Sequence, residues 1–183
     1  DVFWEIIFIK LISYIFVIFL FYILFCINGD YAIFYRILII ELLANLVDIS
    51  WFFQGNEDFG KTVIRNMIVK ITGLVLIFIF VKNQNDLWKY FLIYVLSDLL
   101  GNLSLWVYVP KYLEKRKRKT LSLKKHIKPI ILLFLPQVSV QIYAVLDKTM
   151  LGLLTNSMSE VAYYDQAQKI IRALLLIVSA MGT

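Results

Sequence analysis

The stretch Asp48-Ile-Ser-Trp-Phe-Phe-Gln-Gly-Asn-Glu-Asp-Phe-Gly-Lys-Thr-Val-Ile-Arg-Asn66 joins two long apolar segments through a short polar turn. The apolar segment before the turn carries the acids Glu41 and Asp48, and the segment after it carries the bases Arg65 and Lys70. A charged side chain inside a lipid-facing helix is costly, so such residues usually face a protein interior or a water-filled path. The arrangement therefore indicates a membrane protein that moves a polar object across the bilayer.

The composition of the whole chain is that of a membrane protein. The 183 residues are 61% hydrophobic and 17% charged, with a mean hydropathy of +0.77, whereas a soluble chain is about half apolar and a quarter charged. The apolar residues fall into long runs, and about 20 consecutive apolar residues are needed to cross a bilayer. We predict an all-α membrane protein, a polytopic transmembrane helical bundle, with six spans at residues 8–27, 32–53, 63–81, 87–109, 129–153 and 163–183.

The two ends of the sequence indicate a segment of a larger polytopic protein. The chain begins at Asp1 with neither a methionine nor a basic leader, and it ends inside or just after the sixth apolar run. Cys26 is the single cysteine, in an apolar span, and His126 is the single histidine, in a basic segment. Because the sequence has neither a His/Cys cluster nor a Cys–His pair, we expect no metal site, no cofactor and no thiol nucleophile.

The distribution of bases predicts the orientation of the chain in its membrane. Short loops rich in Lys and Arg stay on the cytoplasmic side, so we expect the 111–128 segment and the Gln54–Lys61 turn to be cytoplasmic. The turns at residues 28–30, 82–86 and 154–159 then face outward. Orientation and anionic headgroups account for the basic segment without a nucleic acid partner. Nine of the 19 bases lie in it: Lys111, Lys115, Arg116, Lys117, Arg118, Lys119, Lys124, Lys125 and Lys128.

The same basic segment is the predicted boundary between two parts of the molecule. Four spans precede it, at residues 1–110, and two follow, at residues 129–183. Pro129 is predicted to mark the entry of the next helix, where a missing N–H costs nothing. Many transporters are built as two helical bundles with the substrate path between them, so we predict a two-lobe, exporter-like architecture with 111–128 as its linker.

Polar residues within the spans are the candidates for function, and each has a structural alternative. Glu41, Asn45 and Asp48 follow an i, i+4, i+7 spacing and share one helix face. Together with Arg65 and Lys70 they either line a hydrated cavity for a charged substrate or pair across the hairpin, as Asp48 would with Arg65. The sequence leaves both alternatives open.

Further polar residues lie in the first, second and fourth spans. Asp98 and Asn102 are one turn apart and either line a cavity or form an interhelical hydrogen bond. Lys10 and Arg36 lie near span ends, where long side chains extend to the interface.

The fifth apolar run contains a proline and a polar stripe. Pro136 removes a backbone hydrogen bond and is predicted to kink the helix, while Gln137 and Gln141 lie one turn apart. A kinked helix with amide side chains fits a gate or a cavity wall, and it also fits ordinary packing, since membrane helices tolerate proline. The neighbouring Asp147 and Lys148 are expected to neutralise each other near the outer surface.

Several separated motifs resemble those of the Wzx-type polysaccharide flippases, the O-antigen, capsule and teichoic-acid members of the multidrug/oligosaccharidyl-lipid/polysaccharide exporter superfamily. The resemblance rests on the 48–59 stretch with Arg65-Asn66, on Leu135-Pro136-Gln137 through Gly152, and on Glu160-Val-Ala-Tyr-Tyr-Asp-Gln-Ala-Gln-Lys169. It runs along nearly the whole chain. In the twelve-helix plan of that family, the chain would supply helices three to eight, and alone it would not transport.

The resemblance implies an alternating-access exporter that flips an undecaprenyl-pyrophosphate-linked oligosaccharide from the cytoplasmic to the outer leaflet. A cavity with Arg and Lys would hold the pyrophosphate by charge-assisted hydrogen bonds. Arg65, Lys70 and then Arg36 are the candidates for that role, and Gln137 and Gln141 are the candidates for the sugars. The expected partners are the lipid-linked oligosaccharide, membrane lipids and other polysaccharide assembly proteins. The acids Glu41, Asp48 and Asp98 would carry coupling protons or cations.

Two other classes of protein remain as alternatives. A drug or cation antiporter of the same superfamily would share the fold but depend more on its acids than on its bases. A membrane polysaccharide polymerase would need a sizeable outward loop with catalytic residues, and the outward turns here are only a few residues long. We therefore expect a transporter and not an enzyme.

Overall fold

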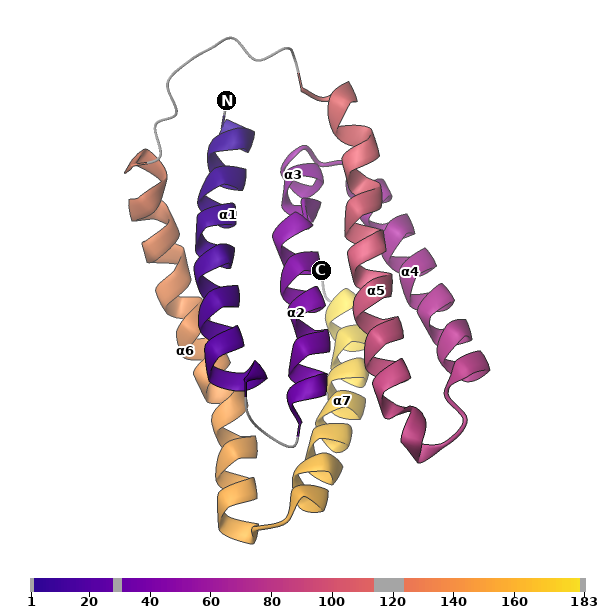
Figure 1. Ribbon diagram of the computed structural model, residues 1–183. Helices are drawn as coiled ribbons and strands as arrows, with labels where there is room; N and C mark the ends of the chain where they lie inside the picture. The colour runs from indigo at the N-terminus through magenta and orange to yellow at the C-terminus, as the bar shows by residue number, and fades with distance from the viewer. Residues whose placement is uncertain (1, 28–30, 114–123, 182–183) are drawn as a thin grey trace. The chain divides into compact units, whose positions relative to one another are not determined.

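A computed structural model describes residues 2–27, 31–113 and 124–181 (Figure 1). Within these ranges the chain is helical and contains no strand, which confirms the predicted all-α class. The chain divides into two compact units, residues 1–123 and 124–183. The division falls inside the 111–128 segment that the sequence analysis assigns to the linker.

The first unit contains five α-helices. Helix α1 continues into a single π-helical turn at Tyr22–Cys26, and α5 is preceded by a 3-10 turn at Gln84–Asp86 and continues into a 3-10 segment at Trp106–Lys111. The helices are α1 Val2–Phe21, α2 Ala32–Val47, α3 Ser50–Gly55, α4 Phe59–Phe80 and α5 Leu87–Leu105.

Four of the helical segments are long and apolar enough to cross a membrane: Val2–Cys26, Phe59–Phe80, Gln84–Lys111 and Lys125–Thr155. The 16 residues of α2 span about 24 Å at 1.5 Å per residue, which is less than the hydrocarbon core of about 30 Å. The helix of the second unit that is not among these four segments, at residues 158–181, carries charges in its first half. The assignment of the 32–53 and 163–183 runs as spans therefore stays a prediction.

Helix α5 packs against both α2 and α4, and Figure 1 shows it beside each of them. The α4–α5 contact is close because small residues face it. A Cβ atom on Gly101 would overlap Val69 Cγ2, and one on Gly73 would lie 3.4 Å from Ser97 Oγ. Small residues at helix interfaces are how membrane helices gain close packing.

The second predicted span, 32–53, is wrong as a continuous helix, because it breaks at Asp48–Ile49 into α2 and α3. The ends of helices leave carbonyl groups without partners, and neighbouring side chains supply them here. Asn102 Nδ2 donates to the Ala44 carbonyl at 2.8 Å, and Trp106 Nε1 donates to the Val47 carbonyl at 2.7 Å. Two residues one turn apart, Asn102 on α5 and Trp106 at the start of the 3-10 segment that follows it, therefore hold the end of α2.

The short helix α3 ends in a Schellman motif at a residue that is not glycine. Glu57 has a φ of 59°, in the left-handed region. Its N–H donates to the Gln54 carbonyl at 3.0 Å, and the Asp58 N–H donates to the Phe53 carbonyl at 2.9 Å. This is the paired hydrogen-bond pattern that closes helix C-termini. The turn directs the chain straight into α4.

The core of this unit is an aromatic and aliphatic cluster around α3. Its residues come from the start of α1, from α3 and from the end of α5, so the Trp51-Phe-Phe53 sequence packs inward here. Phe3 contacts Phe52 edge to face, with the ring centroids 4.8 Å apart. The buried members are Phe3, Ile49, Phe53, Leu105 and Val109.

The second unit consists of α6 Lys124–Thr155 and α7 Met158–Met181. The predicted start of the fifth span at Pro129 is wrong: α6 begins at Lys124, and Pro129 lies in its second turn. Asn156, with a φ of 53°, ends α6, and its N–H donates to the Gly152 carbonyl at 3.0 Å. Asparagine tolerates this left-handed conformation better than most residues.

Candidate functional site

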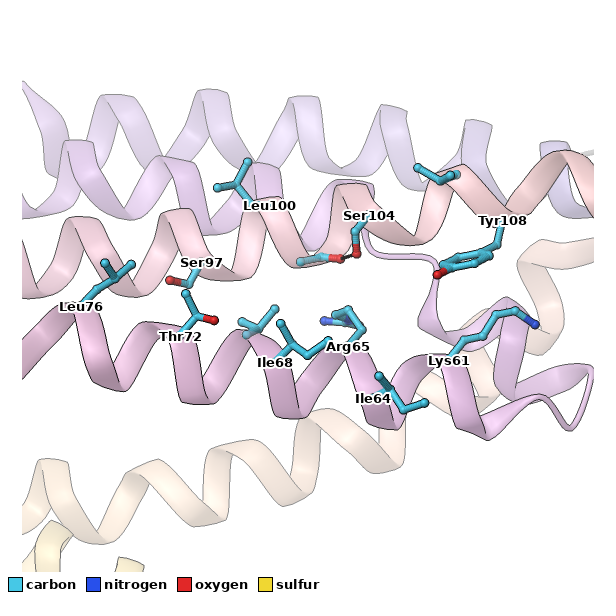
Figure 2. Close-up of a pocket in the computed structure, with 13 residues that line it drawn as sticks. Lys61, Ile64, Arg65, Ile68, Thr72, Leu76, Ser97, Leu100, Ser104 and Tyr108 are labelled. Carbon is cyan, nitrogen blue, oxygen red and sulfur yellow. Dashed lines mark hydrogen bonds between the residues drawn. The ribbon is translucent and has the colours of Figure 1, made fainter.

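A groove of about 610 Å³ runs along the contact between α4 and α5 (Figure 2). Lys61 and Arg65 on α4 and Tyr108 after α5 lie toward one end of it, and Leu76 lies toward the other. Thr72, Ser97 and Ser104 add hydroxyl groups. The rest of the lining is largely apolar: Ile64, Ile68, Val69, Leu100, Gly101 and Val107.

Arg65 joins the groove to the break between α2 and α3. Its Nη2 donates to Ser50 Oγ at 2.5 Å and lies 3.7 Å from Asp48 Oδ1. Ser50 Oγ in turn donates to Asp48 Oδ1 at 2.5 Å. The Arg65 side chain is 13% exposed and the Asp48 side chain 32%. The guanidinium is thus held by the Ser50 hydroxyl and the Asp48 carboxylate.

Part of the hydrogen-bonding capacity of Arg65 is unused. A guanidinium has five N–H donors in a fixed planar fork. Arg65 Nε is buried and has no hydrogen-bond partner among the described residues. A buried donor without a partner costs about 1–3 kcal/mol, so the site favours an acceptor from outside the described residues.

Lys61, one turn before Arg65, is held at the mouth of the groove. Its Nζ donates to Asp58 Oδ2 and to the Tyr112 hydroxyl, and Tyr112 also donates to Asp58. The ammonium lies 4.8 Å from the centre of the Tyr112 ring. The hydrogen bonds from Lys61 and Tyr112 keep the pKa of the Asp58 carboxyl below its ordinary value. This network links the first turn of α4 to the residues that follow α5.

The other predicted charges lie beside this arrangement but do not line the groove. Lys70 is exposed on α4 and makes no hydrogen bond or ion pair within the described residues. Asp98 on α5 is within electrostatic range of both Lys70 and Arg65. Glu41 interacts with Asp98 across the α2–α5 contact, and Asn45 Nδ2 donates to its backbone carbonyl at 3.0 Å. Asp98 therefore lies within electrostatic range of the other two predicted acids, Glu41 and Asp48, and of the bases Arg65 and Lys70.

Arg36 and Lys10 each bind a backbone carbonyl at a helix end, and their predicted place at the membrane interface stays a prediction. Arg36 donates through Nε and Nη2 to the Cys26 carbonyl at 3.3 and 3.2 Å, at the end of α1. Lys10 Nζ donates to the Asp48 carbonyl at 2.7 Å. Both bases therefore satisfy carbonyl groups at helix ends.

In the second unit, the predicted Asp147–Lys148 pair is wrong. Adjacent residues on a helix do not face each other, and each of the two contacts α7 instead. Lys148 forms an ion pair with Asp165, and Tyr164 donates to Asp147 Oδ2 at 3.4 Å. Lys169 Nζ also lies 2.8 Å from Asp165. These contacts fix the α6–α7 hairpin.

The predicted gate residues lie on one continuous helix. α6 passes through Pro136 without a break. Gln137 and Gln141 are exposed in this unit and make no hydrogen bond within the described residues. Their amides are therefore available, and the gate stays a prediction.

The groove itself was not predicted from the sequence. Its small and hydroxyl residues on α5, Ser97, Gly101 and Ser104, follow an i, i+4, i+7 spacing. Such a stripe is the sequence signal for a helix that another helix approaches closely. Leucine and aromatic residues surround these three positions in the sequence, so the spacing does not stand out from it.

Comparison with known proteins identifies the family. A Shigella dysenteriae protein named "Putative O-antigen transporter" is 38% identical over 60 residues, which are 32% of this chain and 15% of that protein. The aligned part of the chain thus spans about a seventh of that relative. No solved structure matches. The sequence pattern of the family described as "Polysaccharide biosynthesis protein" matches residues 1–183, and the chain belongs to that family.

Proposed function

We propose that the intact protein is a flippase, which moves an undecaprenyl-pyrophosphate-linked oligosaccharide from the cytoplasmic to the outer leaflet. Membership of the polysaccharide biosynthesis family supports a role in polysaccharide export. The name of the Shigella relative points to the same class of cargo. The protein acts as a transporter and not as an enzyme.

The observation that carries this proposal is the environment of Arg65. Its guanidinium borders an apolar groove, is held by Ser50 and Asp48, and keeps a buried N–H without a partner. A pyrophosphate offers several anionic oxygens that such a fork binds strongly. The site therefore suits a phosphate that enters with an apolar group attached.

The other candidate residues contribute positive charge, ion coupling and contacts with the sugars. Lys70 supplies a second positive charge at mid-helix, and Arg36 a third. Glu41, Asp48 and Asp98 carry the coupling proton or cation, because intramembrane acids commonly do so. The Gln137 and Gln141 amides meet the sugars, since an amide both donates and accepts hydrogen bonds. Pro136 gives their helix the kink of a gate.

The protein lies in the bacterial cytoplasmic membrane with the 111–128 segment on the cytoplasmic side. The two units of the chain belong to the two lobes of an alternating-access exporter. The lipid-linked oligosaccharide is its substrate, and other polysaccharide assembly proteins receive the product.

Deletion of the gene for the intact protein tests the function. We expect surface polysaccharide to disappear while the lipid-linked oligosaccharide accumulates on the cytoplasmic side. Restoring the gene should reverse both changes. Normal surface polysaccharide in the deletion strain, with no related exporter induced, would reject the flippase.

A drug or cation antiporter is the second candidate, and the presence of two acids, Glu41 and Asp98, within electrostatic range of each other favours it. In an antiporter, Glu41→Gln and Asp98→Asn would abolish activity while Arg65→Lys would have little effect. Drug resistance and surface polysaccharide, measured on the same variants, separate the two candidates. Glycosyltransferase genes beside this one would favour the flippase.

A further inference from the structure

The groove between α4 and α5 is polar at one end and apolar along the rest of its length. Lys61 and Arg65 are one helical turn apart at the polar end, and Ile68 and Leu76 follow on the same side of α4 (Figure 2). From Arg65 to Leu76 the helix rises about 16 Å at 1.5 Å per residue. This groove, called the trough below, thus has a cationic end, its mouth, at Lys61 and Arg65.

We propose that this trough binds the isoprenoid chain of the lipid carrier, with the carrier's phosphate at Lys61 and Arg65. The inference rests on the proposed function, because it takes the carrier of the exported oligosaccharide as the ligand. It adds the place of the apolar tail. The oligosaccharide then extends away from α4 while the tail stays against the α4–α5 contact.

Charge complementarity selects a phosphate for the mouth of the trough. The charged side chains that line the trough, among the described residues, are both cations. Their partners Asp58 and Asp48 are not part of the lining. Lys61 Nζ gives two of its three N–H donors to Asp58 and Tyr112, so one donor is left for a ligand, together with the unpartnered Arg65 Nε.

The close packing of α4 and α5 beside the trough favours a ligand with a single tail. α4 and α5 approach closely at Gly101, where a Cβ would overlap Val69 and lie 3.3 Å from Arg65 Cδ. A polyprenyl carrier has one tail below its phosphates, whereas a bilayer phospholipid has two. Burial of apolar surface contributes roughly 25 cal/mol per Å², so a tail along the trough adds affinity that a free pyrophosphate lacks.

Photocrosslinking of the intact protein in membranes tests the inference. One probe is undecaprenyl pyrophosphate with a diazirine in one of the isoprene units nearest the pyrophosphate, which would lie beside Ile68, Thr72 and Leu76. The other is phosphatidylglycerol with a diazirine at the end of an acyl chain. At equal mole fractions, we expect the first probe to label Ile68, Thr72 or Leu76 at least several-fold more than the second.

A matched pair of variants controls for the position. Thr72 lines the trough and Ile71, its exposed neighbour, does not. Thr72→Trp should block the trough and reduce labelling by the carrier probe roughly tenfold, the effect of losing about 1.4 kcal/mol of binding free energy. Ile71→Trp should leave labelling unchanged.

Three results would overturn the inference. Equal labelling of the trough by both probes would show that bulk lipid fills it. Carrier labelling confined to other helices would show that protein covers the trough, and loss of labelling in both variants would show that position 72 has no special role. The deletion strain tests the flippase separately. If deletion abolishes surface polysaccharide and the wild-type protein exports normally while its trough residues stay unlabelled, only the tail site is rejected.

Discussion

Arg65 combines a structural role with the binding role that we propose for it. Its Nη2 group stabilises the α2–α3 break through Ser50 and Asp48, and its Nε group lies buried without a partner. The two alternatives that the sequence left open, pairing and cavity lining, therefore apply to different atoms of the same side chain. Lys70 has no such pairing and is exposed. The two bases should respond differently to substitution.

Lys70→Ala should keep the membrane abundance of the intact protein near that of the wild type and reduce surface polysaccharide. Arg65→Ala should lower the abundance itself, because it leaves polar groups at the break without a donor, at about 1–3 kcal/mol. Immunoblots of membranes alongside surface polysaccharide assays measure the two effects.

The double variant Arg65→Ala, Asp48→Ala is the control for pairing. It should recover part of the abundance without recovering export. If Lys70→Ala lost abundance and a second substitution at Asp98 restored it, Lys70 would be a structural partner and its proposed substrate role would fall.

Glu57 offers a stability test at a single backbone position. Its left-handed conformation costs a residue with a Cβ atom about 1–2 kcal/mol, whereas glycine adopts it freely. Glu57→Gly should therefore raise the melting temperature of the detergent-solubilised protein. Glu57→Ala removes the same charge but keeps the Cβ, so it should not. Equal shifts in both variants would assign the effect to charge.

At the scale of helices, the sequence predicts features that depend on the residues of one segment. It does not predict features that depend on contacts with other helices. The long apolar runs locate α1, α4, α5 and α6, because length and hydropathy are properties of each run. The break at Asp48–Ile49 lies inside an apolar run without glycine or proline, and it depends on Asn102 and Trp106, more than fifty residues away. Asp48 with Ser50 was the one local signal, since both types favour helix starts.

The α4–α5 contact provides the test at this scale. Gly101→Ala should destabilise the first unit by about 1–3 kcal/mol, the usual cost of overpacking, because its Cβ would overlap Val69, a β-branched residue with little rotamer freedom. Adding Val69→Ala should relieve the overlap. Thermal unfolding of the purified protein measures both.

Gly60→Ala is the matched control on α4, where a Cβ meets no atom within 4 Å. It should be neutral or stabilising by up to about 1 kcal/mol, because alanine favours helix more than glycine does. Equal losses at positions 60 and 101 would contradict the close-packing explanation.

At the scale of the whole molecule, charge and hydropathy predict a linker at residues 111–128, and the two-lobe division built on it stays a prediction. The boundary between the two units at residues 123 and 124 lies within the basic 111–128 segment. Residues 114–123 of that segment lie outside the described residues. The sequence did not predict that the last part of the segment, from Lys124, belongs to α6. The start of a helix depends on capping and on contacts with neighbouring residues, which the composition does not give. The charge of a segment follows directly from its count of charged residues.

The orientation of both units gives the last prediction. In a Cys26→Ala background of the intact protein, Ser122→Cys tests the basic segment and Ser159→Cys tests the turn after α6. Ser159 is exposed, and it is preferable to Asn156, whose left-handed conformation a cysteine would strain. A membrane-impermeant maleimide should label position 159 in intact cells and position 122 only after permeabilisation, because Lys- and Arg-rich loops stay on the cytoplasmic side. The reverse pattern would invert both units and place Lys61 and Arg65 near the outer leaflet, where a carrier phosphate would be bound at the end of its translocation and not at the beginning.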